Sequence, residues 1–189
     1  PLVTNNITYN NFGMPVSALR NNGYKTQTTT NALGQMIKSQ ILNSQGVAVL
    51  SYSYNYNPEG NLLSMRITSN TTYQGTANYN YTYNNHNQLI GFKATGDSKL
   101  FPRVKSQAMD SQTYSYGIND NIDKIITKTQ TSNGKITTHT KDYNYYLNTG
   151  HPNRLKYLNL NTNDQGYSQS QMYKYNKNGQ PLQTATGSS

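Results

Sequence analysis

A short phrase of the form Y-x-Y-N-x-x-G-x-L recurs along the chain and constrains its fold more than any other feature. In one copy Asn57 follows Tyr56, Gly60 lies four residues after it, and the apolar Leu62 lies six residues after it. Gly, Asn or Asp at the fourth position tolerates the positive φ that a hairpin turn needs. Asn at the first position can hydrogen-bond the turn backbone two residues on. Each copy therefore predicts a β-hairpin. The other copies are Tyr9 with Asn10 and Gly13, a weaker one at Thr30 with Asn31 and Gly34, Tyr83 with Asn84, Asn87 and Leu89, Tyr116 with Asp120 and Ile122, a lengthened one at Tyr145, and Tyr175 with Asn176 and Gly179.

The spacing of the copies predicts how the hairpins are joined. Neighbouring anchors lie between 21 residues (9 to 30) and 33 residues (83 to 116) apart, which fits hairpins of variable strand length better than a strict solenoid. A second turn signal, such as Asn22-Gly23 or Asn133-Gly134, lies between each pair of anchors. We therefore predict an all-β fold over residues 1–189: a single array of about seven antiparallel hairpins that form a long, twisted, curved sheet.

Tyrosine is the residue that we expect to hold this sheet together. The chain has 18 Tyr but 3 Phe and no Trp, and hydrophobic residues make up only 33% of it. A tyrosine ring packs on one side while its hydroxyl stays in water, which suits half-buried strands. Tyr52, Tyr54 and Tyr56 share one face by the period of two. Rows of tyrosine, rather than a thick aliphatic core, are the predicted packing.

One segment, DSKLFPRVKSQAMDSQ from Asp97 to Gln112, departs from the repeat. We expect an insertion here, either a flap or a short helix at the rim of the sheet. Off-pattern loops on a regular scaffold often carry function, and basic side chains gather around this one. The candidate binding residues are Lys93, Lys99, Phe101, Arg103 and Lys105. The alternative is that the segment only bridges two hairpins.

The residues that usually carry catalysis are scarce. The chain has no Cys, seven carboxylates and three His, and it lacks paired metal-ligand motifs, nucleophile motifs and phosphate-binding loops. We predict no enzymatic activity, no metal and no cofactor. The net charge of +9 permits anionic partners, but no nucleic-acid-binding motif accompanies it, so nucleic acid is not a predicted partner. No apolar run approaches the roughly 20 residues that a membrane-spanning helix needs.

The repeated phrase resembles the YD-repeat, or RHS-repeat, family, over about residues 7 to 185. Members of that family usually carry Tyr-Asp where this chain has Tyr-Asn, as at Tyr56-Asn57 and Tyr83-Asn84. The resemblance implies hairpins joined into a sheet that spirals into a hollow shell, as in bacterial RHS proteins, the shell of Tc toxin complexes and the teneurin barrel. It also implies a secreted or surface-exposed bacterial protein, whose partners are the rest of the parent repeat protein or an enclosed cargo. The Asp-containing cleavage-site core of the family's built-in protease is not visible here.

The missing initiator Met indicates a piece of a longer protein, and about seven repeats make fewer strands than a closed shell needs. We therefore expect an open sheet with exposed edges unless a further segment continues it. Three hypotheses of function remain open: a structural shell module, a module that binds glycans through exposed Tyr and Lys, and a fibre or adhesin segment that self-associates. Tyrosines packed against one another favour the first hypothesis, and tyrosines exposed together on a concave face favour the second.

Overall fold

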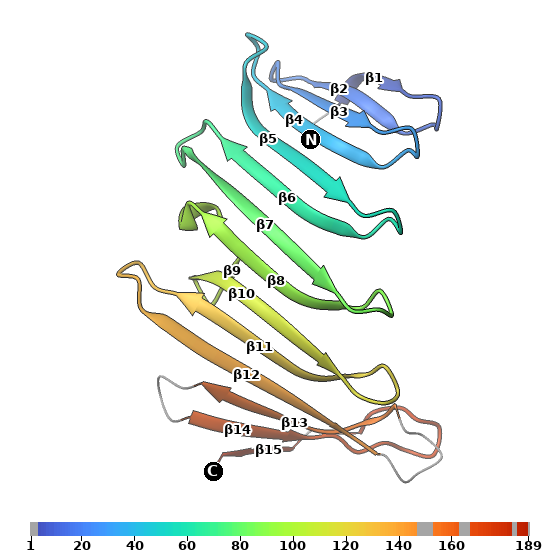
Figure 1. The fold of residues 1–189 in the computed structure, drawn as a ribbon, viewed down its shortest axis with the longest axis vertical. Coiled ribbons are helices and arrows are strands. Elements are labelled where there is room, and N and C mark those ends of the chain that lie inside the picture. Colours follow the sequence, from blue (N-terminus) through green and yellow to red (C-terminus); the bar gives the residue numbers. More distant parts are fainter. Residues whose placement is uncertain (1–3, 147–152, 163–166, 183–184, 189) are drawn as a thin grey trace. The chain divides into compact units, whose positions relative to one another are not determined.

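The computed structural model describes residues 4–146, 153–162, 167–182 and 185–188, and almost all of them lie in strands and tight turns (Figure 1). The elements are β1 (Thr4–Tyr9), β2 (Pro15–Arg20), β3 (Lys25–Thr30), β4 (Met36–Leu42), β5 (Ala48–Tyr56), β6 (Leu62–Ser69), β7 (Gly75–Tyr83), β8 (Leu89–Gly96), a 3-10 turn η1 (Ser98–Leu100), β9 (Arg103–Val104), β10 (Gln107–Tyr116), β11 (Ile122–Gln130), β12 (Ile136–Tyr145), β13 (Leu155–Thr162), β14 (Tyr167–Met172) and β15 (Ala185–Ser188).

The strands follow one another in the sheet in the same order as in the chain. The order runs from β1 to β8 and then from β10 to β15, and the short β9 pairs only with β10. The strand pairs of the described residues are antiparallel, and the sheet is open. This confirms the prediction of an all-β fold built from antiparallel hairpins. No helix within the described ranges is long and apolar enough to cross a membrane.

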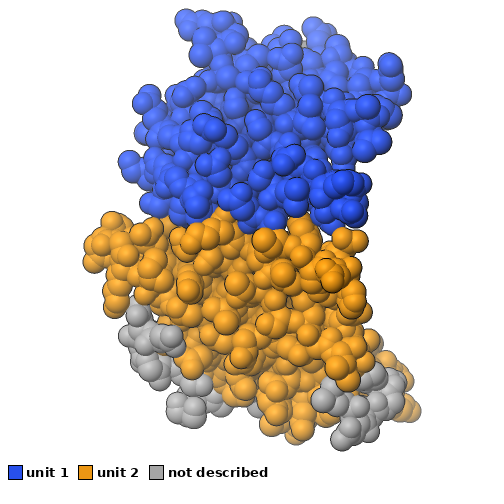
Figure 2. Space-filling view, viewed as in Figure 1, with its two compact units in different colours: residues 1–81, 94–101 blue, residues 82–93, 102–189 orange. Residues whose placement is uncertain are grey.

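The chain divides into two compact units, coloured separately in Figure 2. Unit 1 comprises residues 1–81 and 94–101, and unit 2 comprises residues 82–93 and 102–189, so the division falls within the β7–β8 hairpin. Each unit has its own distribution of apolar and polar side chains over the two faces of its strands.

In unit 1 the two faces of the strands differ in chemistry. Across β5, β6 and β7, Tyr54 lies opposite Met65, which lies opposite Tyr79. We call the face that carries these residues the tyrosine face. Ser53, which precedes Tyr54 on β5, lies opposite Arg66 of β6, and Arg66 lies opposite Asn78 of β7. These three residues form a row on the opposite, polar face. The period of two along each strand therefore separates apolar from polar side chains across the whole of this row.

Residues 97–101 pack onto the tyrosine face of unit 1. The Asp97 amide donates to the Thr76 carbonyl at 2.9 Å, and the Asp97 side chain accepts a hydrogen bond from the Lys99 amide at the start of η1. The Tyr79 hydroxyl donates to the Leu100 carbonyl, and Tyr79 is 2% exposed while Phe101 is 6% exposed. The segment thus closes over the most deeply buried tyrosine.

The segment expected to be an insertion, residues 97–112, is only in part an irregular loop. The expected short helix is present as the single 3-10 turn η1, followed by β9. Residues 107–112 instead begin β10, where Ser111 pairs with Lys93 and Gln112 with Phe92 of β8. A register shift on β10 between Met109 and Ser111 hides this strand from a search for simple alternation.

In unit 2 a hydrogen-bonded polar row takes the place of an aliphatic core. Thr127 and Thr129 on β11 and Thr137 on β12 are buried. The Gln112 amide donates to the Thr127 hydroxyl at 2.8 Å, and the Thr129 hydroxyl donates to the Gln107 side chain. Every described buried side-chain nitrogen or oxygen has a hydrogen-bond partner. This face of unit 2 is therefore stabilised by matched hydroxyls and amides.

Candidate functional site

Four of the anchor turns share one geometry that is centred on an asparagine. In the first, the Asn10 Oδ1 atom accepts hydrogen bonds from the amides of Phe12 at 2.9 Å and Met14 at 3.0 Å. The Asn10 amide donates to the Met14 carbonyl at 3.0 Å. Asn31, Asn84 and Asn176 make the same pair of side-chain hydrogen bonds. Gly13, Gly34, Gly60, Asn87, Asp120 and Gly179, the residues at the fourth position, all have positive φ.

The side-chain amide of the asparagine has a partner of its own in each of these four turns: Asn10 Nδ2 donates to the Thr30 hydroxyl at 3.2 Å, and in the other three turns the acceptor is a Gln four residues later. Asn31 Nδ2 donates to the Gln35 side chain at 2.7 Å, Asn84 Nδ2 donates to Gln88 at 2.6 Å, and Asn176 Nδ2 donates to Gln180 at 2.9 Å. An ionised aspartate has no such donor. In the Asn31, Asn84 and Asn176 turns, the Gln four residues later therefore uses a donor that an aspartate would lack.

One residue of this kind was missed by the sequence reasoning. Asn43 Oδ1 accepts from the amides of Gln45 at 3.0 Å and Val47 at 2.9 Å, and Gly46 has a φ of 79°. The linking turn between β4 and β5 therefore has the same construction as an anchor turn. The sequence signal is N-x-x-G, but Leu42 stands where the repeat phrase has its tyrosine, so the phrase does not include this turn.

The anchor tyrosines connect neighbouring repeats through their hydroxyl groups. The Tyr56 hydroxyl donates to the Met36 carbonyl at 2.9 Å, Tyr116 donates to Leu89 at 2.8 Å, and Tyr145 donates to Ile122 at 2.8 Å. In each case the acceptor is the residue at the sixth position of the preceding repeat, where a new strand begins. We call these three hydrogen bonds the tyrosine struts. They explain why the position holds Tyr, since Phe has no donor.

The remaining anchors differ in their surroundings. Tyr9, in the first repeat, is 61% exposed. Tyr175 lies edge-on to Tyr146, with ring centroids 6.4 Å apart, and the Arg154 guanidinium lies 5.5 Å from the Tyr175 ring centroid. Tyr83 ends β7, and Leu62, the apolar residue after the Tyr56 turn, begins β6.

Burial changes the acidity of several tyrosines on these strands. Desolvation raises the pKa above the usual 10.0, and neighbouring tyrosines or, for one residue, a carboxylate raise it further. For Tyr145 the secondary causes are Asp123 and Tyr143. The tyrosines with a raised pKa are Tyr54, Tyr79, Tyr114, Tyr143 and Tyr145.

The candidate binding residues around the expected insertion are divided between the two units: Lys99 and Phe101 belong to unit 1, and Lys93, Arg103 and Lys105 belong to unit 2. Phe101 is 6% exposed, so the residue at the centre of the predicted binding site serves packing instead. Lys93 pairs with Asp110, with Nζ 3.9 Å from Oδ2, and Arg103 donates to the Ser106 carbonyl at 3.2 Å. Lys99 lies in η1, and Lys105 occupies the β9–β10 turn with a φ of 46°.

The described residues hold no group of three or more His, Cys, Asp or Glu placed to bind a metal ion. Of the histidines, His151 lies outside the described residues, and His86 is exposed in the Asn84 turn. His139 is half-buried on β12, with Nε2 3.2 Å from the Thr129 hydroxyl and Nδ1 3.0 Å from the Thr162 hydroxyl. A histidine between two threonine hydroxyls has the surroundings of a structural residue. That the chain is not an enzyme stays a prediction.

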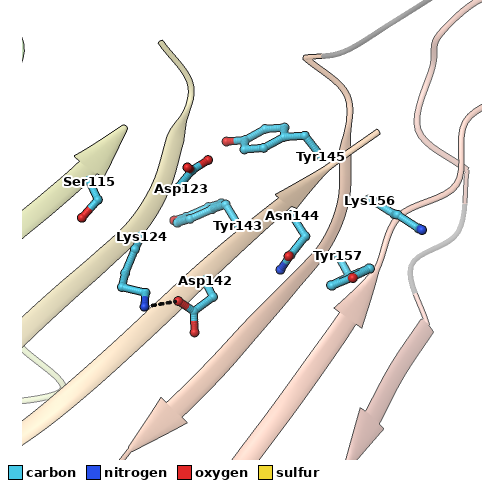
Figure 3. A pocket seen from close by; sticks show the side chains of 9 residues that line it. All are labelled: Ser115, Asp123, Lys124, Asp142, Tyr143, Asn144, Tyr145, Lys156 and Tyr157. Carbon is cyan, nitrogen blue, oxygen red and sulfur yellow. Dashed lines mark ion pairs between the residues drawn. The ribbon is translucent and has the colours of Figure 1, made fainter. Parts of the chain in front are cut away.

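One pocket on unit 2 combines a tyrosine with charged and amide side chains (Figure 3). It has a volume of about 600 Å³, and its lining includes Ser115, Lys124, Asp142, Asn144 and Tyr157. The Lys124 ammonium lies 3.2 Å from the Asp142 carboxylate. The sequence reasoning did not identify this pocket, because its residues come from four strands whose register was unknown.

Comparison with known proteins finds likeness in solved structures only. No family model matches the chain, and no curated protein matches it. A chain in the crystal structure of TcdB2-TccC3-Cdc42 superposes with a TM-score of 0.55 at 12% identity, over 90% of this chain and 10% of that chain. This chain shares its fold with part of that structure. The structure of the Photorhabdus luminescens Tc holotoxin pore, which contains a TccC3 variant, gives a TM-score of 0.51 at 12% identity, over 94% of this chain and 12% of that chain. This chain thus spans about a tenth of each Tc toxin chain that it matches.

Proposed function

We propose that this chain is a non-catalytic structural segment: a β-hairpin part of the wall of a secreted or surface-exposed, toxin-like bacterial protein. The observation that carries the proposal is the fold shared with Tc toxin structures over at least 90% of this chain. The repeated Tyr-Asn turns, which resemble those of the YD/RHS-repeat family, point in the same direction.

The contacts of the tyrosines favour a structural role over ligand binding. Tyr52 and Tyr54 stack on each other, with ring centroids 6.4 Å apart and planes at 12°. Tyr79 is buried beneath residues 97–101, and Tyr56, Tyr116 and Tyr145 use their hydroxyls as struts. A tyrosine engaged with its neighbours in this way has less of its ring and hydroxyl free for an external ligand.

The proposed mechanism is geometric. A continuous ladder of backbone hydrogen bonds leaves no gap between consecutive hairpins, and the struts link the point where one repeat ends to the point where another begins. In unit 1 the polar face, with Ser53 and Arg66, suits solvent, and the tyrosine face suits the enclosed side. The partners implied are further hairpins that pair with the edge strands β1 and β15, together with an enclosed cargo.

Single cysteines introduced on opposite faces test this proposal, because the chain has no Cys of its own. Ser53 lies on the polar face of β5, and Ser39 of β4 lies opposite Tyr52 on the tyrosine face. We would compare S53C and S39C in the full-length gene product, in a background without other cysteines, using a small maleimide and a bulky polyethylene glycol maleimide.

In a closed wall the bulky reagent is expected to modify S53C quickly and S39C only after denaturation. The isolated chain 1–189 is the control, and there both thiols should react, since Ser39 is partly exposed. Equal modification of the two folded full-length variants by the bulky reagent would overturn the proposal.

A further inference from the structure

The register of four strands brings five of the nine side chains that line the pocket of Figure 3 to one face of unit 2. Ser115 of β10 lies opposite Lys124 of β11, and Lys124 lies opposite Asp142 of β12. Asn144 of β12 lies opposite Tyr157 of β13. Residues directly opposite each other point to the same side of an antiparallel sheet, so five side chains of different chemistry converge there.

The functional groups of the pocket match a ligand that both donates and accepts hydrogen bonds. The Lys124 and Asp142 side chains are 46% and 38% exposed although they are paired with each other, so each keeps part of its hydrogen-bonding capacity for a ligand. Asn144 adds a donor and an acceptor, and Ser115 adds a hydroxyl. Adjacent hydroxyl groups of a sugar present the same alternation of donors and acceptors.

The charges of the pocket decide against an anionic ligand. The lining holds two cations, Lys124 and Lys156, and two carboxylates, Asp123 and Asp142, so the formal charge is balanced although the whole chain carries +9. A phosphate or a uronic acid therefore gains little net Coulomb attraction here. A neutral ligand forms its hydrogen bonds without bringing an unmatched charge into the site.

The aromatic part of the lining supplies an apolar surface. The Lys156 ammonium lies 5.6 Å from the ring centroid of Tyr157 and 5.8 Å from that of Tyr146, which holds the cation against the rings. The electron-rich face of a tyrosine ring attracts the C–H groups on the apolar face of a pyranose. The volume of about 600 Å³ lies within the usual range for small-molecule sites.

We propose that this pocket binds a neutral saccharide, with Tyr157 as the stacking surface and Asn144, Asp142 and Lys124 as hydrogen-bonding groups. This site differs from the basic cluster around residues 93–105 that the sequence suggested, and it does not depend on the wall function. It would give a structural segment a means of attachment to a glycan.

The test uses the full-length gene product on a glycan array that carries neutral hexosides and N-acetylhexosaminides beside uronates and sialosides. Saturation-transfer NMR would then measure the affinity for the best neutral glycan. Asn144→Ala is the test variant. Its matched control is Asn55→Ala, because Asn55 also lies between two tyrosines, immediately before an anchor, and is exposed. Tyr157→Ala removes the ring, and Tyr157→Phe keeps it.

The expected result is selective binding of neutral glycans that N144A weakens about fivefold, the equivalent of one ordinary hydrogen bond. Y157A should weaken it at least as much, Y157F should weaken it less than Y157A because it keeps the ring, and N55A should leave it unchanged. Circular dichroism identifies any variant that fails to fold. If one does, hydrogen exchange of the unsubstituted protein, with and without glycan, replaces the affinity comparison, and glycan should protect the backbone amides of Asn144 and Tyr157. Binding of acidic glycans only, no binding, or equal loss in N55A and N144A would each overturn the proposal.

Discussion

Replacing Tyr145 with Phe removes one tyrosine strut and leaves the ring in place. The Tyr145 hydroxyl is half-buried and donates to the Ile122 carbonyl at 2.8 Å. The matched control is Tyr143→Phe, two residues earlier on β12. Its hydroxyl makes no hydrogen bond to the part of the chain that the structure describes, although burial raises its pKa in the same way.

The size of the effect follows from the environment of the hydrogen bond. A neutral hydrogen bond contributes about 1 kcal/mol net to stability. In Y145F the partly buried Ile122 carbonyl also loses this partner, so the variant should lower the free energy of unfolding by about 1–2 kcal/mol. For a chain of this length, 1 kcal/mol corresponds to a fall in Tm of about 2–4 °C. Y143F should be close to neutral, since the half-buried Tyr143 hydroxyl makes no hydrogen bond within the described residues.

Thermal unfolding followed by circular dichroism gives the comparison of Tm, and native-state hydrogen exchange locates the change. We expect faster exchange at the amides of β11 and β12 in Y145F, and unchanged exchange in β2 to β4. Equal costs for Y145F and Y143F, or no measurable cost for Y145F, would refute the idea that the hydroxyl connects the repeats and leave only ring packing.

Four further predictions follow from features of the strands and turns. Burial raises the pKa of five tyrosines above 10.0, so they stay protonated in the folded chain at a pH where the unfolded chain would ionise. These groups should therefore leave the stability unchanged below a pH of about 10 and lower it as the pH rises further. Urea titrations at increasing pH measure this fall. Gly96 has a φ of 100°, and a Cβ added there would collide with the Thr76 carbonyl oxygen, whereas Gly13 has a φ of 72° and open space around it. In chemical denaturation, G96A should lower the free energy of unfolding by about 3 kcal/mol or more and G13A by about 1 kcal/mol. Lys105 and Ser106 both have positive φ in the β9–β10 turn, so the double variant K105N/S106G should raise the Tm by removing strain of about 1 kcal/mol per residue. Asn84→Ala should lose about 1–2 kcal/mol, since two backbone amides lose their acceptor, whereas Asn84→Asp should retain most of the stability in the same denaturation assay.

The positions of the hairpins could be predicted because the information is local. An Asn followed three residues later by a residue that accepts positive φ specifies a turn without reference to the rest of the chain, as at Asn57 and Gly60. The same reasoning failed at residues 107–112, where the register shift on β10 breaks the alternation, and at Asn43, where the tyrosine is missing. It also misplaced Phe101, because the sequence does not show that residues 97–101 fold back onto Tyr79.

The tyrosine struts and the pocket could not be predicted, because both depend on the register between strands. That the Tyr145 hydroxyl meets the Ile122 carbonyl follows from the alignment of β11 with β12, which the repeat phrase does not contain. Ser115, Lys124 and Asp142 are unremarkable strand residues until the pairing places them in one row. Local periodicity therefore predicts the strands and turns, whereas the contacts between side chains of different strands can be known only from the structure.

The strand order also bears on how the chain reaches its folded state. Because nearly all the described strands pair with their neighbours in the chain, the strand pairings close short loops. Folds dominated by such local pairings lose little chain entropy at each step. This strand order therefore allows the hairpins to form one after another, each on the edge of the last completed one.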